Sequence, residues 1–180
     1  MKNSFKIVVD ACVARAAPRK SSPEVLPEKC FEFFDGLKRS NHSLVFDSKL
    51  DIEWRDHAST FAKQALLRLS QEKRVVRLKE KDFNDEFEKI NRCLEDSIAK
   101  SKKKPPEEFS AAEKDMHLLV CAFSTDKIVV SSETKCLKQF RKMKANISCE
   151  FLSSIRWYDP TDKDLDIKLF LNYPRKAKKI

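Results

Sequence analysis

The sequence predicts an α/β fold, a three-layer α/β/α sandwich around a mostly parallel sheet of about four or five strands. Short apolar runs rich in β-branched residues alternate with longer segments in which apolar residues recur every three or four positions. The first pattern is typical of buried strands and the second of amphipathic helices. Their alternation favours a parallel sheet with helices on both faces and right-handed connections between neighbouring strands.

The first expected strand covers residues 5–10. It is an apolar run with Lys6 as its only interior charge and Asp10 at its end. Open α/β sheets bind ligands at the carboxyl ends of their strands. Asp10 is therefore a candidate ligand-binding acid. The alternative is that it only caps the helix expected over residues 11–17.

The other elements follow in order along the chain. Ser48 is the expected N-cap of a long helix, and Ser110 opens an S-x-x-E capping box for a later one. Charges interrupt the third strand, so we expect it near a sheet edge. The further strands are expected over residues 43–47, 74–78, 127–131 and within 149–157, and the further helices over about 26–37, 48–71, 83–98, 111–125 and 134–144.

The chain is expected to form one domain over residues 1–158, followed by a C-terminal extension over 159–180. Pro105 and Pro106 end a lysine-rich stretch, residues 100–106, which predicts an exposed loop after a helix. The extension ends in a basic tail, residues 175–179, which we expect to be mobile.

Charge and cysteine usage restrict the classes of partner and location. The formal charge is +9, from 37 Lys and Arg against 28 Asp and Glu, which favours polyanionic partners such as RNA, DNA or an acidic protein. The 6 cysteines contain no CxxC pair, which argues against a zinc ribbon. We expect them to be reduced and buried in a cytoplasmic protein. Because no run of about 18 apolar residues occurs, no membrane span is expected.

The sequence contains a single glycine, Gly36. A P-loop, a GxGxxG turn and a GxSxG nucleophile elbow each need several glycines, because the backbone must turn sharply or approach a phosphate closely. The standard nucleotide-binding and α/β-hydrolase sites are therefore excluded.

Four acids from distant segments are expected at equivalent places along one sheet edge. Acids gathered in a dry cleft repel one another, and a divalent cation relieves that repulsion. Oxygen ligands without histidine or thiol suit Mg²⁺ or Mn²⁺, and the chemistry that fits is metal-assisted phosphodiester hydrolysis. The four acids are Asp10, Glu53, Asp115 and Glu133.

Two of these positions have alternatives. Asp47 and Asp51 compete with Glu53 for the place of the second acid. Asp115 is also explained as an acid in an early helical turn, where the helix dipole favours negative charge.

Three stretches resemble the PIN-domain nucleases, a family that includes the toxin ribonucleases of bacterial toxin–antitoxin modules. They are the apolar strand ending in Asp10, the segment SKLDIEW around Glu53, and residues 115–133. In that family the third acid opens a helix and is followed by a small residue at +7, Thr or Ser at +16 and a fourth acid at +18. Counted from Asp115, those positions hold Ala122, Ser131 and Glu133.

The resemblance implies a metal-dependent endoribonuclease of PIN-like fold. It implies that Asp10, Asp115 and Glu133 bind Mg²⁺ or Mn²⁺, that Glu53 is a fourth catalytic acid, and that Ser131 helps to hold the cluster. It also suggests the toxin of a toxin–antitoxin module, with an antitoxin protein as partner and pairing of two copies.

Basic residues in the helix after Glu133 form a candidate track for the RNA backbone. A solvated helix face explains them equally well. The residues are Lys135, Lys138, Arg141 and Lys142.

Two positions depart from the family pattern. Glu133 stands where the family usually has Asp, and Cys12 stands where it commonly has Asn or Ser. These departures support an alternative function, a catalytically weak or inactive PIN-fold module that binds nucleic acid or protein. A DNA-directed nuclease of the same fold is a third interpretation. We expect Trp54 and His57 to be packing residues, and we assign no role to His117.

Overall fold

The computed structural model describes residues 4–17, 25–101, 105–145, 147–162 and 166–180. It is an α/β fold built on one six-stranded sheet with the order β3-β2-β1-β4-β5-β6. Strands β1 to β5 pair in parallel, and β6 pairs antiparallel with β5 at one edge. The strands are β1 Lys6–Val9, β2 Ser43–Phe46, β3 Val75–Arg77, β4 Ile128–Val130, β5 Arg156–Tyr158 and β6 Lys178–Lys179.

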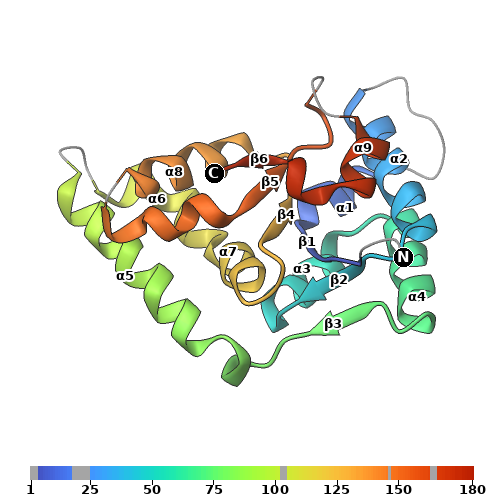
Figure 1. Cartoon of the computed structure of the whole chain (residues 1–180), viewed down its shortest axis with the longest axis horizontal. Helices are drawn as coiled ribbons and strands as arrows, with labels where there is room; N and C mark the ends of the chain where they lie inside the picture. The colour runs from blue at the N-terminus through green and yellow to red at the C-terminus, as the bar shows by residue number, and fades with distance from the viewer. Residues whose placement is uncertain (1–3, 18–24, 102–104, 146, 163–165) are drawn as a thin grey trace.

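Two groups of helices lie on opposite sides of this sheet (Figure 1). One group packs together around α2, which contacts α1, α4 and α9, while α3 packs on α1. The other group packs around α5, which contacts α6, α7 and α8. This is the layer arrangement of an α/β/α sandwich. The α-helices are α1 Ala11–Ala16, α2 Val25–Arg39, α3 Ser48–His57, α4 Thr60–Gln71, α5 Asn84–Lys100, α6 Pro105–Lys114, α7 Met116–Phe123, α8 Thr134–Lys144 and α9 Ile167–Asn172, and the 3₁₀ helices are η1 Glu80–Asp82, η2 Ile147–Ser154 and η3 Pro174–Lys176.

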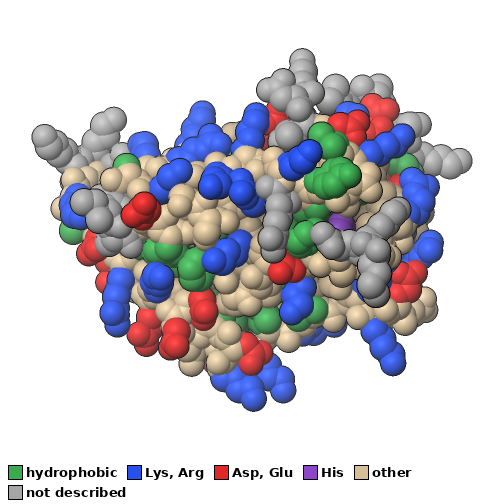
Figure 2. All heavy atoms as spheres, viewed as in Figure 1, with side chains coloured by type: hydrophobic (Ala, Val, Ile, Leu, Met, Phe, Trp, Pro, Cys, Tyr) green, Lys and Arg blue, Asp and Glu red, His purple; other side chains and the backbone are tan. Residues whose placement is uncertain are grey.

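The central strands form the middle of a single hydrophobic core. Ile7, Val8 and Val9 of β1 are all at most 1% exposed, as a strand covered on both faces requires. On the face in Figure 2, Lys and Arg side chains are scattered over the surface, and acidic side chains gather mainly in its lower part. Within the described residues, no helix is long and apolar enough to cross a membrane.

All five expected strands are present, and β3 lies at a sheet edge as predicted. The sixth strand was not predicted. It belongs to the basic tail, which was expected to be mobile but instead forms η3 and then pairs with β5. Phe170 of α9 stacks on Tyr158 with ring centroids 3.9 Å apart, and Ile180 is 1% exposed. The segment after residue 158 therefore packs on the same core.

The long helix predicted over residues 48–71 is wrong, because the chain forms α3 and α4 there. The break lies at Ala58 and Ser59, and the Ser59 hydroxyl caps α4 by accepting a hydrogen bond from the N–H of Ala62 at 3.1 Å. The predicted cap of the first half is also displaced by one residue. Asp47, not Ser48, caps α3 by accepting from the N–H of Leu50 at 2.7 Å.

The helix predicted over residues 111–125 is wrong in the same way. Ser110 lies inside α6, so the S-x-x-E pattern does not start a helix there. The loop predicted over residues 100–106 is too long, because α5 includes Lys100 and α6 begins at Pro105; residues 102–104 lie outside the described residues. The chain has instead two helices, α6 and α7, which meet at Asp115. The last strand lies at the end of its expected range and extends one residue beyond it, because η2 takes up most of the segment before it.

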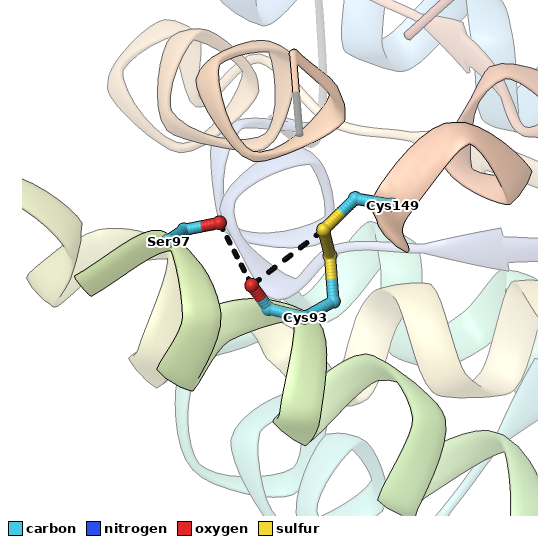
Figure 3. Close-up of a disulfide and its surroundings, with 3 residues drawn as sticks. All are labelled: Cys93, Ser97 and Cys149. Atoms are coloured by element: carbon cyan, nitrogen blue, oxygen red, sulfur yellow. Dashed lines mark hydrogen bonds between the residues drawn. A yellow bond between two sulfur atoms is a disulfide. The ribbon is translucent and has the colours of Figure 1, made fainter. Parts of the chain in front are cut away.

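The expectation of six reduced cysteines is wrong for two of them. Cys93 of α5 and Cys149 of η2 form a disulfide with Cα atoms 5.5 Å apart (Figure 3). The carbonyl oxygen of Cys93 also accepts a hydrogen bond from the hydroxyl of Ser97 at 2.7 Å. Since 56 residues separate the two cysteines, their spacing gave no sign of pairing. The free cysteines are Cys12, Cys30, Cys121 and Cys136.

Trp54 fixes α3 on the central strand and is a packing residue, as expected. Its ring lies edge-on against Phe34 and Phe46, and its Nε1–H donates to the carbonyl oxygen of Val9 at 2.8 Å. Because Val9 precedes Asp10 and Trp54 follows Glu53, this bond joins the segments that carry two of the candidate acids.

We expect Trp54→Phe to lower the free energy of unfolding, because it leaves the buried carbonyl of Val9 without a partner. An unpaired buried acceptor costs about 1–3 kcal/mol. Urea denaturation followed by far-UV circular dichroism measures the change. The control is Leu67→Ala, at a leucine that is 61% exposed, where we expect a change within about 0.5 kcal/mol. Equal stability of the two variants would contradict the role given to Trp54.

Candidate active site

A pocket of about 230 Å³ lies at the carboxyl ends of β1 and β4. The chain passes from β1 to β2 on one side and later returns to β4 on the other side of β1. In open α/β sheets, this reversal of strand order creates the crevice in which ligands bind. The structure brings all four sequence-predicted acids into the lining of this one pocket: Asp10, Glu53, Asp115 and Glu133.

Asp10 is the most completely held of the four. Its Oδ1 accepts from the N–H of Cys12 at 3.0 Å, which makes Asp10 the N-cap of α1. Its Oδ2 accepts from the hydroxyl of Ser131 at 2.6 Å and from the thiol of Cys12 at 3.0 Å. Asp10 is thus both a helix cap and a pocket residue, so the two interpretations of its position are compatible.

Ser131 connects two of the acids. Its hydroxyl donates to Asp10 and accepts from the N–H of Glu133 at 3.0 Å. The serine is itself fixed by β5, because its N–H donates to the carbonyl of Tyr158 at 3.0 Å and its carbonyl accepts from Nε1 of Trp157 at 3.1 Å. Ser131 therefore connects the carboxylate of Asp10 to the backbone of Glu133.

Asp115 occupies the junction between α6 and α7. Its side chain forms no capping bond with α7, although the residue is the N-cap of that helix. Burial raises the pKa of this carboxyl above its usual value, and the charge of Asp10 raises it further. Lys114, His117 and a hydrogen bond with the thiol of Cys136 act in the opposite direction. The interruption of the helix thus places an acid with a raised pKa in the pocket.

Glu53 is the second acid of the pocket. The two competing candidates, Asp47 and Asp51, do not line the pocket. Asp47 caps α3 instead, and Asp51 pairs with Arg77 at 3.3 Å. The approach of the His117 ring lowers the pKa of Glu53, against the effect of burial. His117 Nε2 lies 3.5 Å from Glu53 Oε2, a distance at which the two groups interact but form no well-made hydrogen bond.

Glu133 reaches the pocket from the start of α8. Its Oε1 accepts from the N–H of Lys135 at 3.2 Å and so caps that helix. The other basic residues predicted as an RNA track, Lys138, Arg141 and Lys142, follow along α8 on its exposed surface. None of the four lines the pocket, so both interpretations of these residues stay open.

Three basic residues also line the pocket: Arg15, His57 and Lys114. The sequence analysis did not single out Arg15 or Lys114, and its expectation that His57 is a packing residue is wrong. All three are exposed, and we call them the basic rim. Each lies within five residues of a candidate acid. This short separation in the sequence was the signal that could have identified them, because a base close in sequence to a candidate acid lies near the same end of the sheet.

The lining fits a hard divalent cation by its chemistry. Four carboxylates supply oxygen donors. Burial is the main cause of the raised pKa of Asp115, and the charge of Asp10 is the second cause; a cation would relieve the repulsion between these two acids. In the described parts of the chain, no three histidine, cysteine or acidic side chains are already arranged to hold a metal ion.

Comparisons of this chain with protein-family models, with curated proteins and with solved structures give no match. The likeness to the PIN-domain nucleases therefore rests on the residues quoted from the sequence.

We expect Asp115→Asn to raise the melting temperature at neutral pH in the presence of EDTA. The folded state binds the Asp115 proton more tightly than the unfolded state, so ionisation of this group destabilises the fold. The penalty develops as the pH rises above the ordinary value of 3.8. The gain from the substitution should therefore be largest near neutral pH and disappear below that value.

Differential scanning calorimetry over a pH series measures this effect, and a gain of 1 kcal/mol corresponds to about 2–4 °C for a chain of this size. The matched control is Asp51→Asn, which changes a partly exposed acid outside the pocket. A lower melting temperature for Asp115→Asn at neutral pH would show that the Asp115 carboxylate stabilises the fold instead.

Proposed function

We propose that this protein is a metal-dependent endoribonuclease of PIN-like fold, which hydrolyses RNA phosphodiester bonds. The observation that carries the proposal is the convergence of four acids, from four separate segments, on one pocket at the reversal point of the sheet. Acids gathered in one pocket repel one another and so oppose folding, which makes such a cluster a candidate functional site.

Asp10, Asp115 and Glu133 would hold Mg²⁺ or Mn²⁺, with Glu53 as the fourth acid. A bound divalent cation supplies an activated water and stabilises negative charge on the attacked phosphate. The chain's own contribution is orientation. Ser131 and Cys12 fix the Asp10 carboxylate, and Ser131 also fixes the backbone of Glu133.

The basic rim would bind the phosphates on either side of the bond that is cut. Arg15 comes from α1 and Lys114 from the end of α6, so the two cations reach the acidic pocket from different helices. Lys135 and Lys138 of α8 would continue the contact along the RNA backbone. Phosphate contacts of this kind position a nucleic acid without reading its sequence.

A PIN-fold module that binds nucleic acid or protein without efficient catalysis is the second candidate. It is favoured by one observation, that the Glu133 carboxylate caps its own helix through the N–H of Lys135.

The catalytic proposal extends to the toxin of a toxin–antitoxin module, with an antitoxin protein and a second copy of the chain as partners.

Purified protein should cleave RNA in Mn²⁺ or Mg²⁺ and not in EDTA. We expect Asp10→Asn and Asp115→Asn each to reduce the rate by about 10²-fold or more, because a displaced reacting group alone has an effect of that size. Asp51→Asn serves as the control and should retain activity. Gel analysis of a structured and an unstructured RNA measures all four proteins.

Two results would contradict the endoribonuclease proposal. Retained RNA binding with no cleavage in either metal would establish the binding module. Preferential cleavage of branched or flap DNA would assign the site to a DNA-directed nuclease.

Substitution of residues in the basic rim should lower the affinity for RNA and should make that affinity less dependent on salt. For single strands, each lost phosphate contact reduces the slope of log K against log[salt] by about 0.7. We expect this change for Arg15→Ala and for Lys114→Ala, measured by fluorescence anisotropy over a salt series. Lys63→Ala, on the exposed face of α4 and outside the pocket, is the control. Equal slopes for all variants would show that the rim does not contact RNA.

A further inference from the structure

His117 is a buried histidine with an unusual environment. Its side chain is 8% exposed, and neither ring nitrogen has a hydrogen-bond partner among the described residues. Buried polar groups are nearly always paired, so each exception calls for an explanation. His117 lies on the first turn of α7, directly after Asp115 and Met116.

His42 shows how this chain accommodates a buried histidine that has a structural role. It is 2% exposed, and both of its nitrogens are used. Its Nδ1 accepts from the N–H of Phe5 at 3.1 Å, and its Nε2 lies 2.6 Å from the carbonyl oxygen of Leu171. These contacts join the start of β1 to the C-terminal segment. His117 makes no comparable backbone contacts in the described structure.

His117 contacts an acid of the pocket. Its Nε2 lies 3.5 Å from Oε2 of Glu53, so the contact connects α7, which begins after Asp115, to α3. Glu53 lines the pocket, whereas His117 is not part of the lining. The imidazole of His117 therefore contacts the Glu53 carboxylate without lining the pocket itself. Hydrogen bonds in such sites are often long without a ligand and shorten in the working complex.

We propose that His117 is a positioning residue, which holds the Glu53 carboxylate toward the cation of the acidic pocket. The inference rests on the proposed function, because it needs a cation in that pocket. Carboxylates that bind metals are themselves oriented by hydrogen bonds from a second layer of residues, and loss of such a partner reduces metal affinity or activity by about 10- to 100-fold. The unpaired buried ring is the group that would supply this bond.

The test measures Mn²⁺ affinity by isothermal titration calorimetry, alongside the melting temperature in EDTA. We expect His117→Leu to weaken Mn²⁺ binding by about 10- to 100-fold. The substitution should not lower the melting temperature in EDTA, because it removes an unpaired polar group from the interior. His117→Gln, which keeps an N–H donor, should recover much of the affinity.

A double-mutant cycle with Glu53→Ala separates positioning from a direct effect. If His117 acts through Glu53, adding His117→Leu to Glu53→Ala should weaken Mn²⁺ binding no further. The control is His42→Leu, which should lower the melting temperature and leave Mn²⁺ affinity unchanged. Unchanged affinity in His117→Leu, or fully additive losses in the cycle, would overturn the inference.

RNA cleavage by the same proteins distinguishes this failure from that of the proposed function. If the His117→Leu and Glu53→Ala losses of Mn²⁺ affinity are coupled but the wild type cleaves no RNA, the positioning role stands and the nuclease proposal is wrong. If the wild type cleaves RNA in a metal-dependent way but His117→Leu leaves Mn²⁺ affinity unchanged, the nuclease proposal stands and the positioning role is wrong. No Mn²⁺ binding by the wild type would overturn both.

Discussion

The arrangement of the acidic pocket depends on one hydrogen-bonded connection between the ends of β1 and β4. The hydroxyl of Ser131 lies between the carboxylate of Asp10 and the N–H of Glu133. Because β4 is paired with β1 on one side and β5 on the other, three strands fix the position of this hydroxyl. The residue is fully buried. The carboxylate of Asp10 and the backbone of Glu133, which are far apart in the chain, are therefore held at the buried centre of the sheet.

Thiols supply part of the polar environment of these acids. Burial and the charge of Asp10 raise the pKa of Cys12 to about 12, and burial also raises the pKa of Cys136. Both thiols stay protonated at neutral pH, so they act as hydrogen-bond donors to Asp10 and Asp115. A protonated thiol is a poor nucleophile. The chemistry of the pocket is therefore that of its carboxylates.

The sequence allowed the five parallel strands and the meeting of the four acids to be predicted, because each of these strands lies in a short apolar run and three of the acids follow a strand. It did not allow β6 to be predicted, because Lys178 and Lys179 are both charged. It did not reveal the two helix breaks. At Ser59 and at Asp115 the apolar stripe continues across the break, since both helices pack on the same core. Ser59 carried a capping signal, but the regular spacing of the apolar residues outweighed it. The Cys93–Cys149 pair depends on packing between segments 56 residues apart, which local patterns do not encode.

The two departures from the PIN pattern have different physical consequences. At Cys12 the thiol donates a hydrogen bond to Asp10 at 3.0 Å, which an Asn or Ser side chain in that place is also able to do. This departure keeps a donor beside the acid. Glu133 instead closes an exposed capping bond with Lys135 at 3.2 Å, and loss of a helix cap costs only about 0.5–2 kcal/mol. The Glu133 side chain thus both caps α8 and lines the pocket, and a cation in the pocket would compete only with this weak cap for the carboxylate.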